Sequence, residues 1–439
     1  LMIRIAFVLV LFHGCCMASM LSAQTKMLPD DRLFSEPTRI IHKWEGESAN
    51  DQFGWTGRRV GDWDNDGIID FVTTAPTYNR GAGKVYVYSS KTGKLLLEKT
   101  GRAGEQFGNS AVGAGDVNGD GILDLLVGAP NRVQTGNAYV YSGEDGSKIL
   151  ELKGILAGDR FGYEVSEMGD IDGDGCDDIF VGAILADGKI AKCGKGFVYS
   201  GKTGDEILSL EGERTGDNFG NAAGCVKVSN GKWLLAIGAQ QAGPNKRGRV
   251  YVYNLENNKA KLAFTIEGDK NSVNLGQMFV SFPGDLDKDG VPDVYASDFS
   301  DNTAARGGGR VVIHSGATGK QLQAINGKHR GEGLGTSPSD AGDVNGDGIG
   351  DLVIGAWQNA EGAKSGGKVY LYSCPDGKLL RTWTCRQAGD TLGFDACGIG
   401  DVDGDGNIDF LLTSAWSPVK GPKTGRVFIV AGDDYSQKE

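Results

Sequence analysis

A dipeptide of an apolar residue and glycine recurs along the chain and constrains its fold more than any other feature. Successive copies start 54 to 59 residues apart, at Phe53-Gly54, Phe107-Gly108, Phe161-Gly162, Phe219-Gly220, Leu275-Gly276, Leu334-Gly335 and Leu392-Gly393. A regular period of this length is typical of repeat architectures in which each unit is one supersecondary element. The chain of 439 residues is therefore interpreted as one array of similar units, because a single ordinary core stops growing at a smaller size.

Each unit carries the signals of four short strands. A short strand follows the apolar-Gly dipeptide, then in most units an aspartate-rich turn, then an apolar strand such as residues 125–129. An alternating third strand such as residues 85–88 and a fourth strand such as residues 95–97 come next, with a Gly-containing turn between them. Such a sheet cannot bury its faces alone, but seven of them can do so around one axis. The sequence thus predicts an all-β fold, a seven-bladed β-propeller of four-stranded antiparallel blades.

The two ends of the chain predict how the ring closes. The seventh unit stops after its third strand, near Val430, and residues 39–44 form a strand that precedes the first unit. Pairing of this N-terminal strand with the last blade would leave no open edge. We expect a signal peptide at 1–23, an N-terminal linker at 24–38, the propeller at 39–432 and a polar C-terminal tail at 433–439.

The N-terminal segment favours export. Arg4 precedes the apolar run 5–12, and small residues follow as far as Ala23, a pattern typical of a secretory signal peptide. The run is too short for a transmembrane helix, which needs about 20 apolar residues, and no later stretch approaches that length. We expect cleavage after Ala23 and a secreted, periplasmic or cell-surface protein, with lipidation at Cys15 as an alternative.

Six units carry a nine-residue loop of the form Asp-x-Asp/Asn-x-Asp-Gly-x-x-Asp. Ca²⁺ is a hard cation that prefers six to eight oxygen ligands, and alternating positions of a tight turn can supply them. Positions 1, 3, 5 and 9 offer side-chain oxygens, position 7 offers a backbone carbonyl, and glycine at position 6 permits a positive φ. The candidate ligands are Asp62, Asp64, Asp66, Ile68 and Asp70; Asp116, Asn118, Asp120, Ile122 and Asp124; Asp170, Asp172, Asp174, Cys176 and Asp178; Asp285, Asp287, Asp289, Val291 and Asp293; Asp343, Asn345, Asp347, Ile349 and Asp351; and Asp401, Asp403, Asp405, Asn407 and Asp409.

The fourth unit lacks this loop. Residues 228–232 contain an Asn-Gly turn and no acidic residue, so we expect this blade to fold without metal and at most six Ca²⁺ sites in the chain. A single acidic loop could be a solvated turn, but six with the same spacing favour calcium. The formal net charge of −12 agrees, since the loops hold much of the excess negative charge. We expect the ions to have a structural role.

The order Phe-Gly, aspartate loop, Gly-Ala-Pro, best seen in residues 107–130 and 161–183, resembles the FG-GAP repeat of the integrin α-subunit N-terminal propeller. The resemblance covers residues 39–432, although the fourth unit is partial. The fifth and seventh units depart from Gly-Ala-Pro at residues 296–298 and 414–416. It implies a calcium-bearing adhesion or ligand-binding domain. Similar repeats also lie beside catalytic domains in other secreted proteins, so the resemblance implies the fold more firmly than the role.

The sequence offers little enzyme chemistry. His42, His314 and His329 lack a second histidine at metal-ligand spacing or a nucleophile motif, and the six cysteines after Cys16 show no regular spacing. We expect most of these cysteines to be small buried apolar residues. No nucleic-acid motif is present. We predict a binding or adhesion module without catalytic residues; the alternatives are a structural envelope or matrix component, or an enzyme with a site in the central funnel. The funnel enzyme is disfavoured because inner strands such as residues 111–113 are mainly small and apolar.

The loops between the second and third strands of each unit should emerge on the face opposite to the calcium loops. Exposed aromatic side chains among cations suit a protein or an anionic glycan, and we expect the ligand on this face. The alternative is a set of ordinary solubilising loops. The residues concerned are Tyr78, Arg80, Arg132, Lys189, Lys192, Lys195, Lys246, Arg247, Phe299, Arg306, Trp357, Lys364, Trp416, Lys420 and Lys423.

Overall fold

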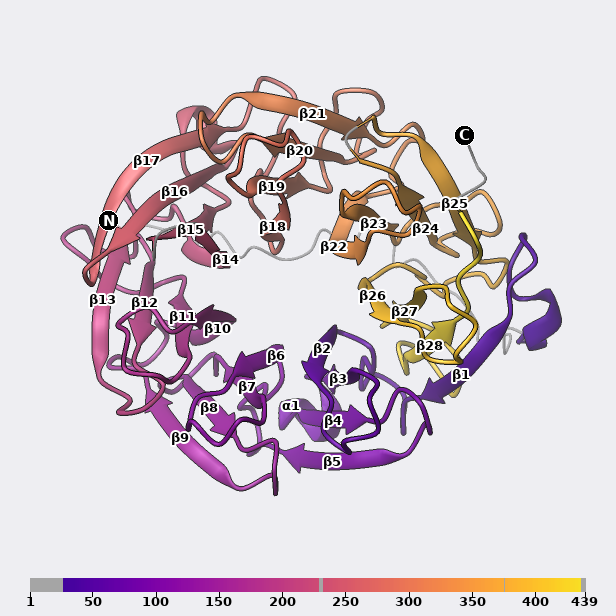
Figure 1. Cartoon of the computed structure of the whole chain (residues 1–439), viewed down its shortest axis with the longest axis horizontal. Helices are drawn as coiled ribbons and strands as arrows, with labels where there is room; N and C mark the ends of the chain where they lie inside the picture. The colour runs from indigo at the N-terminus through magenta and orange to yellow at the C-terminus, as the bar shows by residue number, and fades with distance from the viewer. Residues whose placement is uncertain (1–26, 229–231, 375, 436–439) are drawn as a thin grey trace, which may run out of the picture.

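Seven four-stranded antiparallel sheets stand around a central axis, as the sequence predicts (Figure 1). The structure is a computed structural model and describes residues 27–228, 232–374 and 376–435. Within the first six blades the strands follow the chain order outward from the axis, and in the seventh the outer strand comes from the N-terminal end of the chain. The helical elements of the described residues are short, namely η1 (Asp30–Arg32), α1 (Tyr78–Gly81) and η3 (Pro244–Lys246).

The first four blades run in sequence order. They consist of β2 (Gly57–Gly61), β3 (Asp70–Ala75), β4 (Lys84–Tyr88) and β5 (Leu95–Thr100); β6 (Ser110–Gly115), β7 (Asp124–Ala129), β8 (Asn137–Tyr141) and β9 (Lys148–Lys153); β10 (Phe161–Gly169), β11 (Asp178–Ala183), β12 (Lys195–Tyr199) and β13 (Glu206–Glu211); and β14 (Phe219–Val228), β15 (Lys232–Ala239), β16 (Arg249–Glu256) and β17 (Lys259–Glu267).

The last three blades include the one that joins the two ends of the chain. They consist of β18 (Val280–Gly284), β19 (Asp293–Asp298), β20 (Arg310–His314) and β21 (Gln321–Asn326); β22 (Leu334–Gly342), β23 (Asp351–Ala356), β24 (Lys368–Tyr372) and β25 (Leu379–Thr384); and β26 (Ala396–Gly400), β27 (Asp409–Ser414), β28 (Arg426–Val430) and β1 (Ile40–Glu45).

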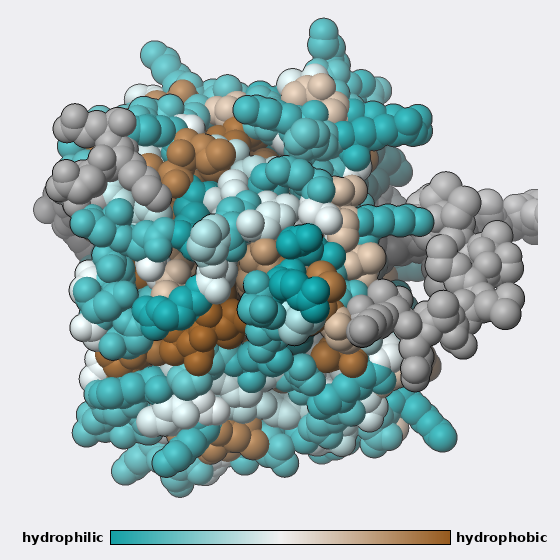
Figure 2. Space-filling model, turned by 90° about the vertical axis from the view of Figure 1, so that its right-hand side faces the viewer, coloured by the Kyte–Doolittle hydropathy of each residue, from teal (hydrophilic) through white to brown (hydrophobic). Residues whose placement is uncertain are grey.

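Ring closure is confirmed. The N-terminal strand β1 pairs antiparallel with β28, from Ile40 opposite Val430 to Glu45 opposite Arg426, and becomes the outer strand of the seventh blade (Figure 1). Because the first and last segments of the chain share one sheet, the ring has no unpaired blade edge at the closure. This side of the molecule shows its apolar residues in separate patches among hydrophilic ones (Figure 2).

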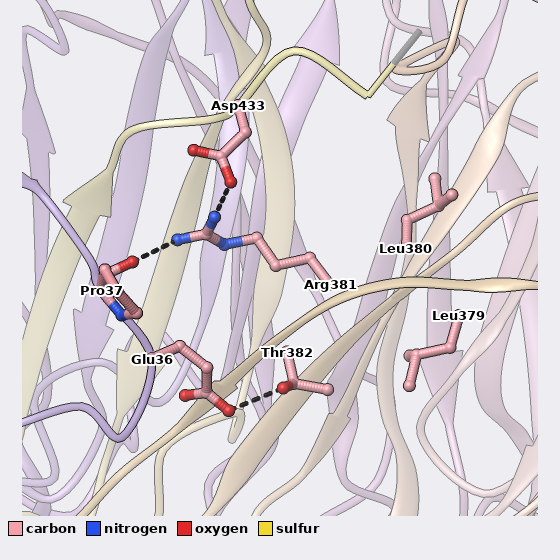
Figure 3. Close-up of a pocket in the computed structure, with 7 residues that line it drawn as sticks. All are labelled: Glu36, Pro37, Leu379, Leu380, Arg381, Thr382 and Asp433. Atoms are coloured by element: carbon pink, nitrogen blue, oxygen red, sulfur yellow. Dashed lines mark hydrogen bonds and ion pairs between the residues drawn. The ribbon is translucent and has the colours of Figure 1, made fainter. Parts of the chain in front are cut away.

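The segment before β1 also contacts the sixth blade. The Glu36 carboxylate accepts a hydrogen bond of 2.7 Å from the Thr382 hydroxyl, and the Arg381 guanidinium donates to the Pro37 carbonyl at 2.8 Å (Figure 3). The Thr384 hydroxyl also donates to Glu36, at 2.7 Å. A surface cavity of about 470 Å³ lies here, lined by Glu36, Pro37, Leu379, Leu380, Arg381, Thr382 and Asp433 (Figure 3). The N-terminal segment therefore holds two neighbouring blades together.

The core lies between the blades. The second strands, such as β3 and β7, are buried at every position, whereas the outer strand β5 alternates between intermediate and exposed residues. A second strand is covered on both faces by neighbouring blades, which explains why its sequence is almost continuously apolar. Packing between blades is thus the main source of buried apolar area.

The recurrent Phe-Gly dipeptide joins one blade to the next. Phe107 is 2% exposed, and its backbone N–H donates to Ala82 of the preceding blade at 3.1 Å. The following Gly108 has φ +80°. A Cβ on Gly83 would lie 2.1 Å from the Phe107 carbonyl oxygen, so only glycine allows this approach. The close contact explains both the period of the repeat and the many glycines of the chain.

Candidate metal centres

The six aspartate loops all connect a first strand to a second strand and therefore share one face of the ring. The loops are numbered by their blade, so that no loop carries the number four, and the third loop (residues 170–178) shows their geometry. Asp170 Oδ1 accepts from the backbone N–H groups of Gly173 (2.7 Å) and Asp174 (3.0 Å), and its Oδ2 accepts from that of Gly175 (3.1 Å). An aspartate whose carboxylate accepts hydrogen bonds from the backbone N–H groups that follow it closes the turn without any other partner. The predicted positive φ at position 6 is confirmed in every loop, at Gly67, Gly121, Gly175, Gly290, Gly348 and Gly406.

The aspartate at position 9 is fully buried in each loop and connects two turns. In the third loop, Asp178 Oδ2 accepts from the N–H of Ile171 (2.8 Å), within the loop. Its Oδ1 accepts from the N–H of Gly201 (3.1 Å), in the hairpin between the third and fourth strands. The same pair of bonds recurs at 2.8 to 3.1 Å for Asp70, Asp124, Asp293, Asp351 and Asp409. Position 9 thus has a structural function that the sequence analysis did not assign.

Burial raises the pKa of these carboxyls. The pKa rises to about 7 for Asp178 and to about 6 for Asp70, Asp124, Asp293 and Asp351, because desolvation disfavours the charged form. Neighbouring loop aspartates add to the rise, for example Asp172 beside Asp178. A cation in the loop would relieve both effects, since it offsets the repulsion and returns a counter-charge to the buried carboxylate.

Four loops bring three carboxylate oxygens within 4.8 Å of one another. These groups are Asp62, Asp64 and Asp66; Asp170, Asp172 and Asp178; Asp285, Asp287 and Asp289; and Asp401, Asp403 and Asp409. The second and sixth loops have an amide at position 3, Asn118 and Asn345. In the sixth loop the amide nitrogen of Asn345 donates to Asp347 at 3.0 Å. The donors of these groups are all carboxylate oxygens, which fits a hard divalent cation.

The backbone N–H of position 7 is hydrogen-bonded within the loop. In each loop its N–H donates to the position-5 aspartate at 2.8 to 3.0 Å; the residues are Ile68, Ile122, Cys176, Val291, Ile349 and Asn407. Strands β14 and β15 of the fourth blade are joined without an aspartate loop, and its turn at 229–231 lies outside the described residues.

The opposite face differs from the prediction of exposed aromatic side chains. Trp357 is only 5% exposed, because it packs edge-on against Trp416 at 4.8 Å between ring centroids and contacts Phe394. Lys423 lies 4.3 Å from the Trp416 ring centroid. The prediction of an exposed side chain is therefore wrong for Trp357, whereas Tyr78, Phe299 and Trp416 are partly exposed.

A different patch on the same face is exposed. Val133, Ile155 and Leu156 are 81%, 83% and 50% exposed, and a hydrogen bond from Gly158 N–H to the Gln134 carbonyl (3.3 Å) joins their two loops. The patch adjoins Arg132 and Arg160. The sequence analysis missed it because it considered only the loops between second and third strands, whereas residues 154–160 connect one blade to the next.

Arg160 is a partly buried cation beside this patch. Its guanidinium lies 4.9 Å from the Tyr163 ring centroid, and its Nε atom is buried with no hydrogen-bond partner. Burial lowers the pKa of Arg160, and the neighbouring charge of Arg132 lowers it further. A cation in this state favours an incoming carboxylate or sulfate group.

The inner strands carry more charge than the sequence analysis expected. Arg58 Nη1 pairs with Asp395 at 3.0 Å, and Arg59 Nη2 pairs with Asp340 at 3.5 Å. Burial raises the pKa of Glu164 to about 8. The Arg58-Arg59 pair within the first inner strand was the available signal. Both arginines are neutralised by carboxylates of the sixth and seventh blades, which gives them a role in joining blades across the ring.

Two histidines contact backbone carbonyls of turns, and the cysteines form no disulfide among the described residues. His42 Nε2 lies 3.1 Å from the Lys91 carbonyl, and His314 Nδ1 lies 3.0 Å from the Gly319 carbonyl. Six described cysteines are free thiols, and all but Cys225 are buried: Cys176, Cys193, Cys225, Cys374, Cys385 and Cys397.

Sequence families match two parts of the ring. The FG-GAP-like repeat family matches residues 54–127, and the FG-GAP repeat family matches residues 339–372. Two segments of the propeller are therefore FG-GAP-type repeats. Each match includes an aspartate loop together with its second strand, so the family pattern and the candidate metal centres coincide.

Curated relatives of this FG-GAP propeller are integrin α chains. Integrin alpha-V of Gallus gallus is 31% identical over 248 residues, which covers 53% of this chain and 24% of the relative. Integrin alpha-4 of Xenopus laevis is 33% identical over 161 residues, covering 34% of this chain and 15% of the relative. The chain thus spans about a quarter or less of the length of these relatives, and the alignments support an integrin-α-like propeller module.

Solved structures show the fold alone. The structure titled as BBS1N in complex with ARL6DN has a TM-score of 0.56 at 9% identity, covering 90% of this chain and 96% of its own. One chain of the mitotic checkpoint complex has a TM-score of 0.56 at 14% identity, covering 96% and 100%. Among the described residues, no helix has the length and apolar character needed to cross a membrane.

Proposed function

We propose that this FG-GAP propeller is a secreted or cell-surface binding module of adhesion type, stabilised by Ca²⁺ and without catalytic activity of its own. The observation that carries the proposal is the cluster of three carboxylates within 4.8 Å, present in four loops on one face. Three carboxylates at this separation repel one another by about 1 kcal/mol per pair even in water. A divalent cation removes that repulsion, and its binding to the folded state alone stabilises the fold.

The ions would be held by the residues predicted for each loop. Side-chain oxygens of positions 1, 3 and 5 and the position-7 carbonyl would face the ion, and position 9 would add its buried carboxylate. The loops are short hairpins that need no partner chain to form, which favours a structural role for the metal. A ring whose loops have most of their repulsion removed by the ions offers a rigid platform for binding on the other face.

For the ligand we propose a protein, with an anionic glycan as the second class, docked on the face opposite to the calcium loops. Exposed Val133 and Ile155 offer apolar contact, and Arg132 and Arg160 offer cations. A protein segment with aliphatic and acidic side chains would use both features, whereas a sulfated glycan would use only the arginines. The combination therefore favours a protein ligand.

Binding of defined probes tests the proposal. The folded chain, loaded with calcium, is assayed against heparin and against a set of acidic extracellular proteins by surface plasmon resonance. Charge reversal in the Arg132→Glu/Arg160→Glu variant should abolish binding of the ligand found. The matched control is Lys94→Glu/Lys320→Glu, which changes exposed lysines at the hairpins on the calcium-loop side. Equal loss in both variants, or no loss in the first, would overturn the assigned face.

A further inference from the structure

The seventh aspartate loop contains a cation from the protein itself. The Arg39 guanidinium forms ion pairs with Asp403, at position 3 of the loop, and with Asp405, at position 5, where Nη2 lies 3.3 Å from Oδ2. The loop is otherwise built like the others, because Asp401 accepts from the N–H groups of Asp405 and Gly406 at 3.0 and 2.9 Å. Arg39 is thus bound to carboxylates that are candidate metal ligands.

The other loops lack such a pair. Among the ion pairs of the described residues, those of Arg39 are the ones that involve a carboxylate of an aspartate loop. Lysines approach the first and third loops differently: Lys91 Nζ donates to the Asp66 backbone carbonyl and Lys202 Nζ to that of Asp174, both at 2.9 Å. These two lysines leave the carboxylates free for an ion, whereas Arg39 occupies them.

The position of Arg39 in the chain links this contact to ring closure. Arg39 directly precedes β1, and its carbonyl accepts a hydrogen bond from the Ala431 N–H at 2.9 Å, beyond the end of β28. The closing strand therefore carries the cation into the loop of the blade that it completes. The Arg39 side chain is 57% exposed, so its guanidinium can move from the loop into water, whereas the Asp403 side chain that it leaves is only 16% exposed and needs another cation.

We propose that Arg39 is an internal counter-cation of the seventh loop that competes with Ca²⁺ for Asp403 and Asp405. This inference rests on the proposed calcium binding. Two consequences follow from it. The seventh site binds calcium more weakly than the sites whose carboxylates are free, and the loop of the blade that closes the ring keeps part of its negative charge neutralised when calcium is absent.

Calcium titration of an Arg39→Gln variant tests the competition. Native mass spectrometry counts the ions bound to the chain at each free calcium concentration, and calorimetry gives the affinity of the weakest site. An exposed ion pair contributes up to about 1 kcal/mol, so its removal should strengthen the seventh site by about fivefold. In an Asp401→Asn background, which disables the seventh loop, Arg39→Gln should have no effect on affinity. The matched control is Arg381→Gln, because Arg381 pairs with Asp433 beside the same closure and contacts no aspartate loop.

The outcomes separate this inference from the proposal on which it depends. If wild type binds calcium and Arg39→Gln leaves every affinity unchanged, the competition is refuted and calcium binding stands. If wild type binds no calcium, both are refuted. Should Arg39→Gln fail to fold, Arg39→Lys can replace it. Lysine keeps a cation but lacks the planar guanidinium that can bind two oxygens at once, so it should give a smaller increase in the calcium affinity of the seventh site. Melting temperature adds a second measurement: Arg39→Gln should lower it more in chelator than in calcium, and an equal loss in both contradicts the inference.

Discussion

Replacement of the buried position-9 aspartate should destabilise the propeller even when no metal is present. In wild type, Asp178 Oδ2 accepts from the N–H groups of Ile171 (2.8 Å) and, more weakly, Asp172 (3.3 Å), and its Oδ1 accepts from Gly201 N–H (3.1 Å); these bonds are buried or partly buried. Asp178→Ala removes both acceptors. An orphaned buried donor costs about 1–3 kcal/mol. We therefore expect a total loss of about 2–4 kcal/mol.

The expected change in melting temperature follows from the size of the chain. Unfolding entropy is about 2 cal/mol/K per residue, so a propeller of this size loses about 2–5 °C for 2–4 kcal/mol. The assay is thermal unfolding followed by circular dichroism in EDTA and in millimolar calcium. Asp178→Asn, which retains one carbonyl oxygen, should lose about half as much in EDTA.

The matched control is Asp172→Ala at position 3 of the same loop. Asp172 Oδ1 accepts a 3.1 Å hydrogen bond from the Asp174 N–H in a partly exposed turn, so its loss should cost less than 1 kcal/mol in EDTA. In calcium it should cost more, because a proposed ligand is lost. An Asp178→Ala variant as stable as wild type in EDTA, and destabilised only in calcium, would refute the structural function of position 9, which is to connect the loop and the hairpin by hydrogen bonds.

Two further predictions concern pH and a buried ion pair. In EDTA, the melting temperature should fall by at least about 2 °C between pH 5 and pH 7.5. Carboxyls with a folded pKa of about 6 to 7 bind protons more tightly than in the unfolded chain, and that stabilisation is lost as pH rises. In calcium the melting temperature should instead rise with pH, since protons compete with the metal, and parallel curves in the two buffers would contradict this prediction. Arg426→Met should lower the free energy of unfolding by about 3–5 kcal/mol in both buffers, because it leaves the fully buried Asp390 without the guanidinium that lies 2.7 Å away. Urea denaturation measures the change. Restored stability in Arg426→Met/Asp390→Leu would support the unpaired buried charge as the cause, and an unchanged midpoint in the single variant would exclude it.

Much of the fold could be predicted from the sequence because the repeat is local and its period is regular. The Phe-Gly dipeptide, the aspartate loop and the second strand lie in a fixed order, and each depends on nearby residues, as Asp170 shows by bonding its own loop. The pairing of β1 with β28 was also predictable, because the strands of the last unit had to be completed.

Other features depended on contacts between distant segments. The ion pairs of Arg58 and Arg39 join residues more than 300 positions apart, and no local pattern specifies them. The burial of Trp357 arises from aromatic side chains of the seventh blade that pack against it, whereas the sequence showed only a loop position. The role of position 9 was hidden because a metal ligand and a hydrogen-bond acceptor require the same residue type.

The most direct test of the account is calcium stoichiometry measured together with thermal stability on the folded chain. Isothermal titration and native mass spectrometry count the bound ions, and unfolding is then compared in millimolar calcium and after chelation. The account predicts six ions per chain, none in the fourth blade, and a large loss of melting temperature on chelation. Absence of bound calcium, with equal melting temperatures in the two buffers, would show that the aspartate loops are turns alone and would contradict the central claim.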